Sequence, residues 1–260
     1  MRGLVLFASL AGAFCLRAPS KCVNNGQIAL VFSDGPVEGT TQVLGALDDE
    51  SMKATFMCST VNIDHPGVAD VIKDMASSGH TVGLRTNPIY SFSDMDETSI
   101  KDAISGELEV LEEIVGEKVK YITVNQEDVN NQDVLQVIDD LGLVLINYNY
   151  DMYGLDDDRE DMLKRWELKL KTVRPQNTSY IVLQHDQRES ELEILPEVVS
   201  SGRERGFEFV NMEECLQGAD MGGDVDGGSG ATIVSRNKAE KSGALAQATL
   251  AACFVGMLAL

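Results

Sequence analysis

Basic residues are scarce in this chain. Of its 260 residues, 21 are Lys or Arg and 42 are Asp or Glu, so the formal net charge is −21 at pH 7. Such a surplus of carboxylates repels a phosphate backbone, and nucleic acids are therefore excluded as partners. The surplus favours cationic partners, although a high charge also simply keeps an extracellular protein in solution.

Histidine and aromatic residues are scarce as well, with three His, one Trp and 6% aromatic residues in all. The histidines can form a metal site only if Asp or Cys side chains join them, and the combination to examine is His185 and Asp186 with Asp151. We interpret His80 as a structural residue and His65 as a loop residue. The few aromatic side chains offer little surface for contact with a sugar ring.

Five cysteines are present, and two of them, Cys15 and Cys253, fall in apolar segments at the two ends of the chain. Cys22 and Cys215 lie near the two ends of the region between these segments, where domain termini often meet. An oxidising compartment would let them pair, although the count alone does not fix the pairing. Cys58 follows an apolar run and is expected to be a buried strand residue.

Residues 1–20 have the layout of a secretory signal peptide. Arg2 precedes an apolar run over residues 4–16, and the small residues Ala18 and Ser20 follow as a cleavage signal. A buried N-terminal helix is the alternative. In a secreted chain, the triplet that begins at Asn177 is an N-glycosylation acceptor.

The C-terminal segment has the pattern of a GPI-anchor signal. Small residues begin at Ser229, our candidate attachment site, a polar spacer follows, and residues 243–260 are almost wholly apolar. A retained membrane anchor is the alternative, and either one tethers the protein to a membrane at the cell surface. The sequence thus divides into a signal peptide (1–20), a domain (21–217), a Gly- and Asp-rich linker (218–242) and a tail (243–260).

Short apolar runs alternate with amphipathic segments through the domain, which predicts strands alternating with helices. The expected strands are 27–32, 54–58, 81–84, 121–124, 144–150, 180–183 and 207–210, and the expected helices are 40–50, 68–78, 98–115, 132–141, 157–173 and 190–205. This alternation predicts an α/β fold with parallel strands. About seven such units favour a distorted (β/α) barrel over an open sheet, although periodicity alone does not decide between them.

Functional groups of parallel α/β folds gather at the C-terminal ends of the strands. The segments at these ends include 33–36 (SDGP), 85–88 (RTNP), Asp151 and His185-Asp186, together with the residues after Val124. We therefore expect these segments to form the functional site.

Several of the same segments resemble those of polysaccharide deacetylases with the NodB homology fold, chitin deacetylases among them. The resemblance extends over about residues 21–217. It is carried by residues 28–36 (IALVFSDGP), 53–56 (KATF), 79–83 (GHTVG), 181–186 (IVLQHD) and 206–210 (GFEFV) with the closing Cys215. It implies a hydrolase that removes N-acetyl groups from a glycan by attack on a non-peptide C–N bond.

The resemblance also implies a metal site. The family holds a divalent cation, usually zinc, with one Asp and two His, and a second Asp acts as the general base. By position the metal-binding Asp is Asp34, whereas Ser33 stands at the base position and Arg85 and Ile89 stand at the two His positions. The Arg that orients the family's base is replaced by Ile122.

Three further residues of the family's site are retained by position, in addition to Asp34. These are Asp151, Leu183 and His185, and His185 would be the general acid. Asp34 could instead cap its turn, and His185 could be a strand-end residue with its hydrogen bonds satisfied. With the base and two ligands replaced, we expect no metal or a weakly held one, no ordinary deacetylation, and an ion pair of Arg85 with Asp34 where the cation would lie.

Three functions remain open at this point. The first is a cell-surface protein that binds a glycan such as chitin or its cationic product chitosan without hydrolysing it. The second is an active deacetylase with a remodelled site, and the third is a structural or interaction protein of the cell wall. Binding of oligosaccharides without release of acetate would favour the first.

Overall fold

The computed structural model describes residues 18–219 except 153–157 and 188. Most of the expected signal peptide, Ser229, nearly all of the linker and the whole tail lie outside the described residues, so these assignments remain predictions. Within the described part of the chain, no helix is both long enough and apolar enough to span a membrane.

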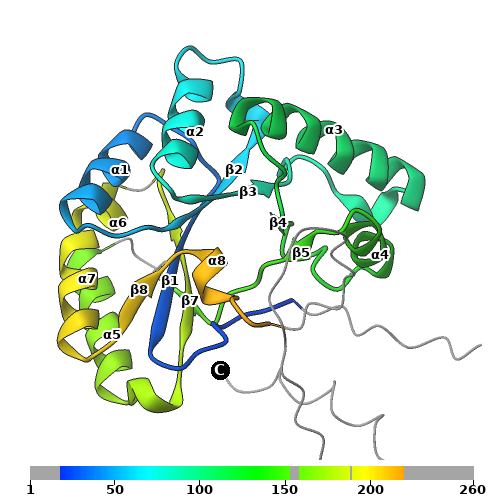
Figure 1. The fold of residues 1–260 in the computed structure, drawn as a ribbon. Coiled ribbons are helices and arrows are strands. Elements are labelled where there is room, and N and C mark those ends of the chain that lie inside the picture. Colours follow the sequence, from blue (N-terminus) through cyan, green and yellow to red (C-terminus); the bar gives the residue numbers. More distant parts are fainter. Residues whose placement is uncertain (1–17, 153–157, 188, 220–260) are drawn as a thin grey trace, which may run out of the picture. The chain divides into compact units, whose positions relative to one another are not determined.

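A curled parallel sheet forms the centre of the fold (Figure 1). Its strands are β1 (Gln27–Ser33), β2 (Thr55–Ser59), β3 (Thr81–Arg85), β4 (Tyr121–Thr123), β5 (Val144–Leu145), β6 (Tyr150–Asp151), β7 (Tyr180–His185) and β8 (Glu208–Val210). Seven of them follow the order β5-β4-β3-β2-β1-β7-β6, and β8 pairs with the first residues of β1. All pairs are parallel, which confirms the α/β prediction. The sheet is a half-barrel.

Helices cover the outer face of this sheet (Figure 1). They are α1 (Thr40–Asp49), α2 (Val68–Ser77), α3 (Glu97–Val115), α4 (Gln132–Asp140), α5 (Arg159–Lys171), α6 (Glu189–Glu193) and α7 (Leu195–Glu204). The short α8 (Met212–Cys215) packs instead on the inner face, and three 3₁₀ turns are present: η1 (Thr60–Asn62), η2 (Phe92–Asp94) and η3 (Pro175–Asn177). Strand side chains alternate between two apolar layers. Leu30 and Phe32 of β1 join the helix-side layer, whereas Ala29 and Val31 face the inside of the curve.

Two expected elements are each divided in the structure. The predicted helix 190–205 is two helices, α6 and α7, because Pro196 lies in the first turn of α7 and has no N–H to continue the hydrogen-bond ladder of α6. The predicted strand 144–150 is two short strands at opposite ends of the sheet: β5 pairs with β4 and β6 pairs with β7. The chain therefore crosses the open side of the half-barrel between Leu145 and Tyr150.

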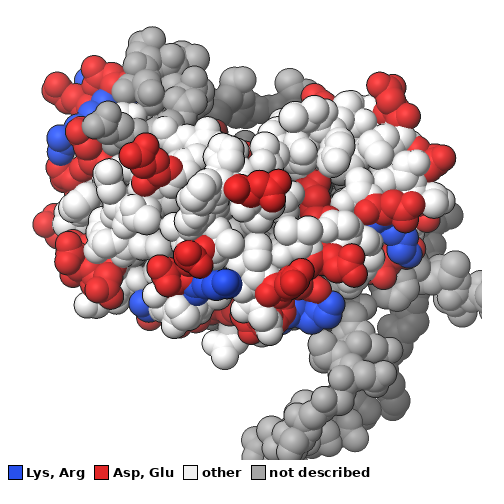
Figure 2. Space-filling model, turned by 90° about the horizontal axis from the view of Figure 1, so that it is seen from above, with Lys and Arg blue, Asp and Glu red and all other residues white. Residues whose placement is uncertain are grey.

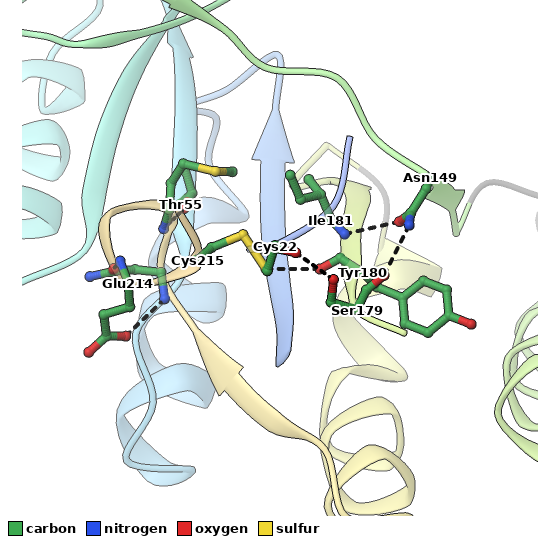
Figure 3. The surroundings of a disulfide bond; sticks show 10 residues. Cys22, Thr55, Asn149, Ser179, Tyr180, Ile181, Glu214 and Cys215 are labelled. Carbon is green, nitrogen blue, oxygen red and sulfur yellow. Dashed lines mark hydrogen bonds between the residues drawn. A yellow bond between two sulfur atoms is a disulfide. The ribbon is translucent and has the colours of Figure 1, made fainter. Parts of the chain in front are cut away.

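A disulfide joins Cys22 to Cys215, as predicted (Figure 3). The backbone N–H of Val23 also donates to the carbonyl of Cys215 at 2.9 Å, so the segment before β1 and the helix after β8 are held together. Both cysteines are buried with Met212 against the inner face of the sheet. Cys58 is unpaired and buried in β2, as expected.

Two asparagines, Asn149 and Asn177, lie near the start of β7. Asn149 donates to the carbonyl of Ser179 and accepts from the N–H of Ile181, both at 3.0 Å, and so begins the pairing that β6 continues (Figure 3). Asn177 ends η3 and is exposed, so it is accessible for a glycan. Its glycosylation remains a prediction.

Candidate functional site

The turn after β1 is fixed by a buried carboxylate. Asp34 has a φ of 73°, in the left-handed region that Asp tolerates better than most residues. A Cβ on Gly35 would collide with the carboxylate of Asp186, so the turn has room only for glycine there. Asp186 is 2% exposed and accepts a hydrogen bond from Thr40 Oγ1 at 2.5 Å. Burial, and next the charge of Asp34, raise the pKa of Asp186 to about 6.

Arg85 and Asp34 form an ion pair at the mouth of the half-barrel. Arg85 Nε donates to Asp34 Oδ1 at 2.8 Å, and the two side chains are 13% and 30% exposed. Nη2 of the same guanidinium donates to Asn125 Oδ1 at 2.8 Å, and Nη1 donates to the carbonyl of Thr86 at 3.1 Å. This pair confirms the sequence-based hypothesis that Arg85 contacts Asp34. The Asp34 carboxylate bonds across to another strand and does not cap its own turn.

The loop after β3 turns Ile89 away from this pair. The Ile89 side chain is 79% exposed, and its N–H donates to Asn87 Oδ1 at 2.9 Å. Asn125 Nδ2 donates to the carbonyls of Pro88 and Tyr90, at 3.3 and 2.8 Å. One asparagine thus holds both Arg85 and the loop that carries Ile89.

His185 lies on the other side of Asp34. Its Nε2 is 3.7 Å from Asp34 Oδ2, and its Nδ1 is 3.3 Å from Oε1 of Glu191, whose side chain is fully buried. Glu191 also accepts from the backbone N–H of His185 at 2.7 Å. Burial lowers the pKa of His185, but the hydrogen bond to Glu191 and the charges of Glu191, Asp34 and Asp151 outweigh burial and raise it above its usual value. Glu191 therefore holds His185 through Nδ1 and the backbone N–H, and Nε2 of His185 faces Asp34 at the centre of the site.

The other sequence-predicted residues lie around this centre. Ser33 is 4% exposed and is paired in register with His185 of β7. Asp151 ends the edge strand β6, where it is paired in register with Leu183 of β7. The structure thus brings Ser33, Asp34, Arg85 and His185 together, whereas Ile89 points to solvent.

Some residues that position the site carry no distinct signal in the sequence. Glu191 falls inside a single predicted helix, where nothing distinguishes it from neighbouring acids. Asn125 belongs to a strand-end segment but has no predicted role of its own. Glu107 is buried on α3, where its carboxylate accepts from the N–H of Asn87 and from Thr60 Oγ1. Burial raises the pKa of Glu107, which these hydrogen bonds and the charge of Arg85 partly offset.

The remaining described histidines lie outside this cluster. His80 is buried, accepts from the N–H of Ala54 through Nδ1 at 3.1 Å and packs edge-on against Phe56. Burial lowers the pKa of His80 to about 4, which fits its interpretation as a structural residue. His65 is an exposed loop residue. Within residues 18–152, 158–187 and 189–219, no three His, Cys, Asp or Glu side chains are arranged to hold a metal ion.

The donors at the centre of the site do not fit a divalent cation. A cation needs several converging oxygen, nitrogen or sulfur ligands. Asp34 Oδ1 instead receives a hydrogen bond from a permanently charged guanidinium, which would repel a metal ion at that place. Acidic side chains outnumber basic ones on the face shown in Figure 2, so attraction of a cation to the wider surface is general and not specific to this point.

Comparison with known proteins shows what the chain is similar to. Residues 20–146 match the family model described as polysaccharide deacetylase. Residues 20–146 are therefore identified as a polysaccharide deacetylase region. It is 29% identical over 209 residues to a chitin deacetylase of Colletotrichum lindemuthianum, covering 75% of this chain and 82% of that relative. It is 24% identical over 196 residues to a peptidoglycan-N-acetylglucosamine deacetylase of Listeria monocytogenes, of whose length the match covers only 40%.

Solved structures of the deacetylase family share the fold. The Colletotrichum lindemuthianum chitin deacetylase superimposes with a TM-score of 0.71 at 23% identity, over 79% of this chain and 94% of that one. A structure described as a CE4 family pseudoenzyme from Bacillus anthracis gives a TM-score of 0.64 at 19% identity, over 74% of this chain and 66% of that one. These matches confirm the half-barrel fold of this chain.

Proposed function

We propose that this chain is a member of the polysaccharide deacetylase family that binds a glycan at the cell surface and does not deacetylate it by the family's metal-dependent reaction. The observation that carries the proposal is the 2.8 Å ion pair of Arg85 with Asp34. It places a permanent positive charge against the one family metal ligand that the sequence retains. The family and its action on glycan polymers supply the ligand class.

The acid–base chemistry is incomplete in the same place. A general base accepts a proton from the attacking water, and a serine hydroxyl such as that of Ser33 cannot do so near neutral pH. His185 retains a position from which it could donate a proton to a leaving group, with Glu191 holding Nδ1. A proton donor without an activated water supplies only a small part of the rate enhancement of a hydrolase.

The charges at the centre nearly balance when His185 is protonated. The Arg85 guanidinium and the His185 imidazolium then face Asp34 and Glu191, and Asp151 adds a third anion nearby, so two cations offset most of the charge of three anions. Such a centre needs no metal to neutralise it and suits a neutral sugar. The acidic surface around it would attract a partly deacetylated, cationic chain such as chitosan.

The location belongs to the proposal as well. Secretion rests on residues 1–20, and tethering rests on Ser229 and the apolar residues 243–260, all read from the sequence. The disulfide between Cys22 and Cys215 supports an oxidising compartment, because such bonds persist outside the cytosol.

The test combines three measurements on the purified, disulfide-bonded domain. We expect no stoichiometric zinc by metal analysis, no acetate released from N-acetylated chito-oligosaccharides with added zinc or cobalt, and measurable binding of the same oligosaccharides by calorimetry. The Arg85→Met variant should bind them more weakly. The matched control is Arg174→Met, an arginine at the other end of the domain.

Two results would overturn the proposal. Release of acetate that depends on added metal and disappears in His185→Ala would identify an active deacetylase with a remodelled site. The absence of binding to any wall polysaccharide would leave an interaction protein in which the inherited site has no ligand.

A further inference from the structure

A hollow lies next to the turn that carries Asp34. It has a volume of about 530 Å³ and lies between the start of α1, η1 and the loop after β7. Its lining residues are Val37, Glu38, Gly39, Gln42, Asn62, Asp186, Gln187 and Leu192. A second hollow of about 530 Å³ shares Val37, Glu38 and Asn62 with it and continues to His65 and Pro66 at the start of α2. These two adjacent hollows are together called the groove.

The inner hollow is next to the site described above. Gln187, from its lining, donates through Nε2 to the carbonyl of Asp34 at 2.8 Å. Asp186 follows His185 directly and fixes the turn that carries Asp34. A chain molecule held at the mouth of the half-barrel can therefore place its next unit in this hollow.

The lining has the chemistry of a sugar subsite. Gln42, Asn62 and Gln187 carry amides, which donate and accept at once and so suit vicinal hydroxyl groups. Val37 and Leu192 are half-buried and provide apolar surface for the face of a ring. Amide side chains over an apolar wall match a hydroxylated ring that has an apolar face.

Much of the polar capacity in this lining is unused. Within the part of the chain that the structure describes, no hydrogen bond involves the side chains of Glu38, Gln42 or Asn62. Asp186 is 2% exposed, and its Oδ1 has no hydrogen-bond partner among the described residues. A buried oxygen without a partner is costly unless a ligand or water supplies one. The lining thus offers two carboxylates, one at its rim and one in its wall.

We propose that the inner hollow binds one amino-sugar unit of the glycan, with the protonated 2-amino group on Glu38 and the ring hydroxyls on Gln42 and Asn62. The inference rests on the proposed function, because it adds a neighbouring subsite to a site that holds the same chain. The hollow also selects between sugar units. A unit with a free amine binds there better than an N-acetylated unit, which carries no positive charge. Glu38 supplies this selectivity through a charge-assisted hydrogen bond.

The test is a titration of the full, disulfide-bonded domain with three tetrasaccharides: glucosamine units, N-acetylglucosamine units, and neutral β-1,4-linked glucose units. Calorimetry measures the affinities, and nitrogen-labelled spectra report side-chain N–H groups. We expect the glucosamine oligomer to shift the amide signals of Gln42 and Asn62. We expect Glu38→Gln to weaken this oligomer about three- to tenfold and to leave the glucose oligomer unchanged.

Glu113→Gln is the matched control, because it removes the same charge from a position on α3, away from the groove. It should leave all three affinities unchanged. If Glu113→Gln weakens the glucosamine oligomer as much as Glu38→Gln does, the effect is general charge attraction and the subsite is refuted.

The two proposals fail in different ways. Shifts confined to Asn125 and the Arg85 Nε–H, with Glu38→Gln without effect, would overturn the subsite and leave glycan binding at the mouth intact. The absence of any shift with all three oligosaccharides would overturn both. Shifts at Gln42 and Asn62 that Glu38→Gln abolishes for the glucosamine oligomer alone would support both.

Discussion

Arg85 Nε and Asp34 Oδ1 lie 2.8 Å apart and join the end of β3 to the turn after β1, across the intervening strand β2. Both side chains are largely shielded from solvent, so the pair is screened less than one on the open surface. Removing Arg85 alone would leave Asp34 beside His185 and Gln187, with its main counter-ion gone. Under the proposed function, the pair supplies, within one site, the charge and the cross-strand link that a bound cation would provide.

Restoring ligands at positions 85 and 89 should not restore a zinc site by itself. We expect the double variant Arg85→His with Ile89→His to bind zinc weakly, because Asn125 holds the loop with the side chain of residue 89 in solvent. Adding Asn125→Ala frees the loop and should raise zinc affinity at least about tenfold. Competition with a chromophoric chelator measures these affinities.

Asn130→Ala is the control for this experiment, since residue 130 lies in the loop that follows Asn125. It should not raise the affinity when it is added to the double variant. Tight zinc binding by the double variant alone would contradict the role assigned to Asn125.

Asp186 should make the stability of the domain fall as the pH rises. Its pKa is about 6 in the folded protein against an ordinary value of 3.8, because burial disfavours the charged form. The folded state therefore binds the proton more tightly, and the resulting stability is present below pH 3.8 and lost as the pH rises through about 6. The loss is about 3 kcal/mol at most.

Asp186→Asn has no proton to release and should remove this part of the pH dependence. Urea unfolding at a series of pH values measures it as the difference between the two proteins. Parallel curves for wild type and variant would show that Asp186 does not titrate in this window.

Glu191 should keep His185 protonated above its usual range. We expect Glu191→Gln to lower the pKa of His185, because the variant removes the charge next to Nδ1 while keeping the size of the side chain. The protonated imidazole contributes stability below its ordinary pKa of 6.5, and this contribution is lost as the pH rises through the higher folded value. Proton resonances of the imidazole ring measure the change. An unaltered titration would show that Glu191 does not set this pKa.

The disulfide should contribute much of the stability of the domain. The two cysteines are 193 residues apart in the sequence. In the chain-entropy model, removing a cross-link that closes so long a loop lowers the free energy of unfolding by about 5 kcal/mol. The double variant Cys22→Ala with Cys215→Ala should therefore unfold at much lower temperature and denaturant concentration. Cys58→Ala is the comparison, as it removes a buried thiol and no cross-link. Equal losses from both changes would show that packing, not the cross-link, is responsible.

The fold could be predicted because its signals are local. Strands β1, β2 and β3 are short apolar runs that end at polar turns, and each expected boundary lies within one residue of the observed one. The divided strand at 144–150 could not be predicted in the same way, because the choice between β4 and β7 as a partner depends on where the curled sheet opens. Pro196 was a local signal, and it marks the break between α6 and α7.

The site could be predicted only in part, for a similar reason. Asp34, Arg85 and His185 follow strands or end them, so the C-terminal edge of a parallel sheet brings them together. Glu191 and Glu107 reach the site from helices, and their importance comes from burial, which an acidic amphipathic sequence does not reveal. Asn125 acts through contacts with a distant loop, which only the assembled structure contains.

The disulfide between Cys22 and Cys215 also brings both chain ends of the domain to the end of the half-barrel where β1 begins. The backbone enters and leaves the half-barrel beside this bond, where β1 begins, whereas Asp34 stands where β1 ends. A tether that continues from Cys215 would thus hold the domain by its base. The proposed glycan site would then lie at the opposite end of β1 from the point where the predicted tether begins.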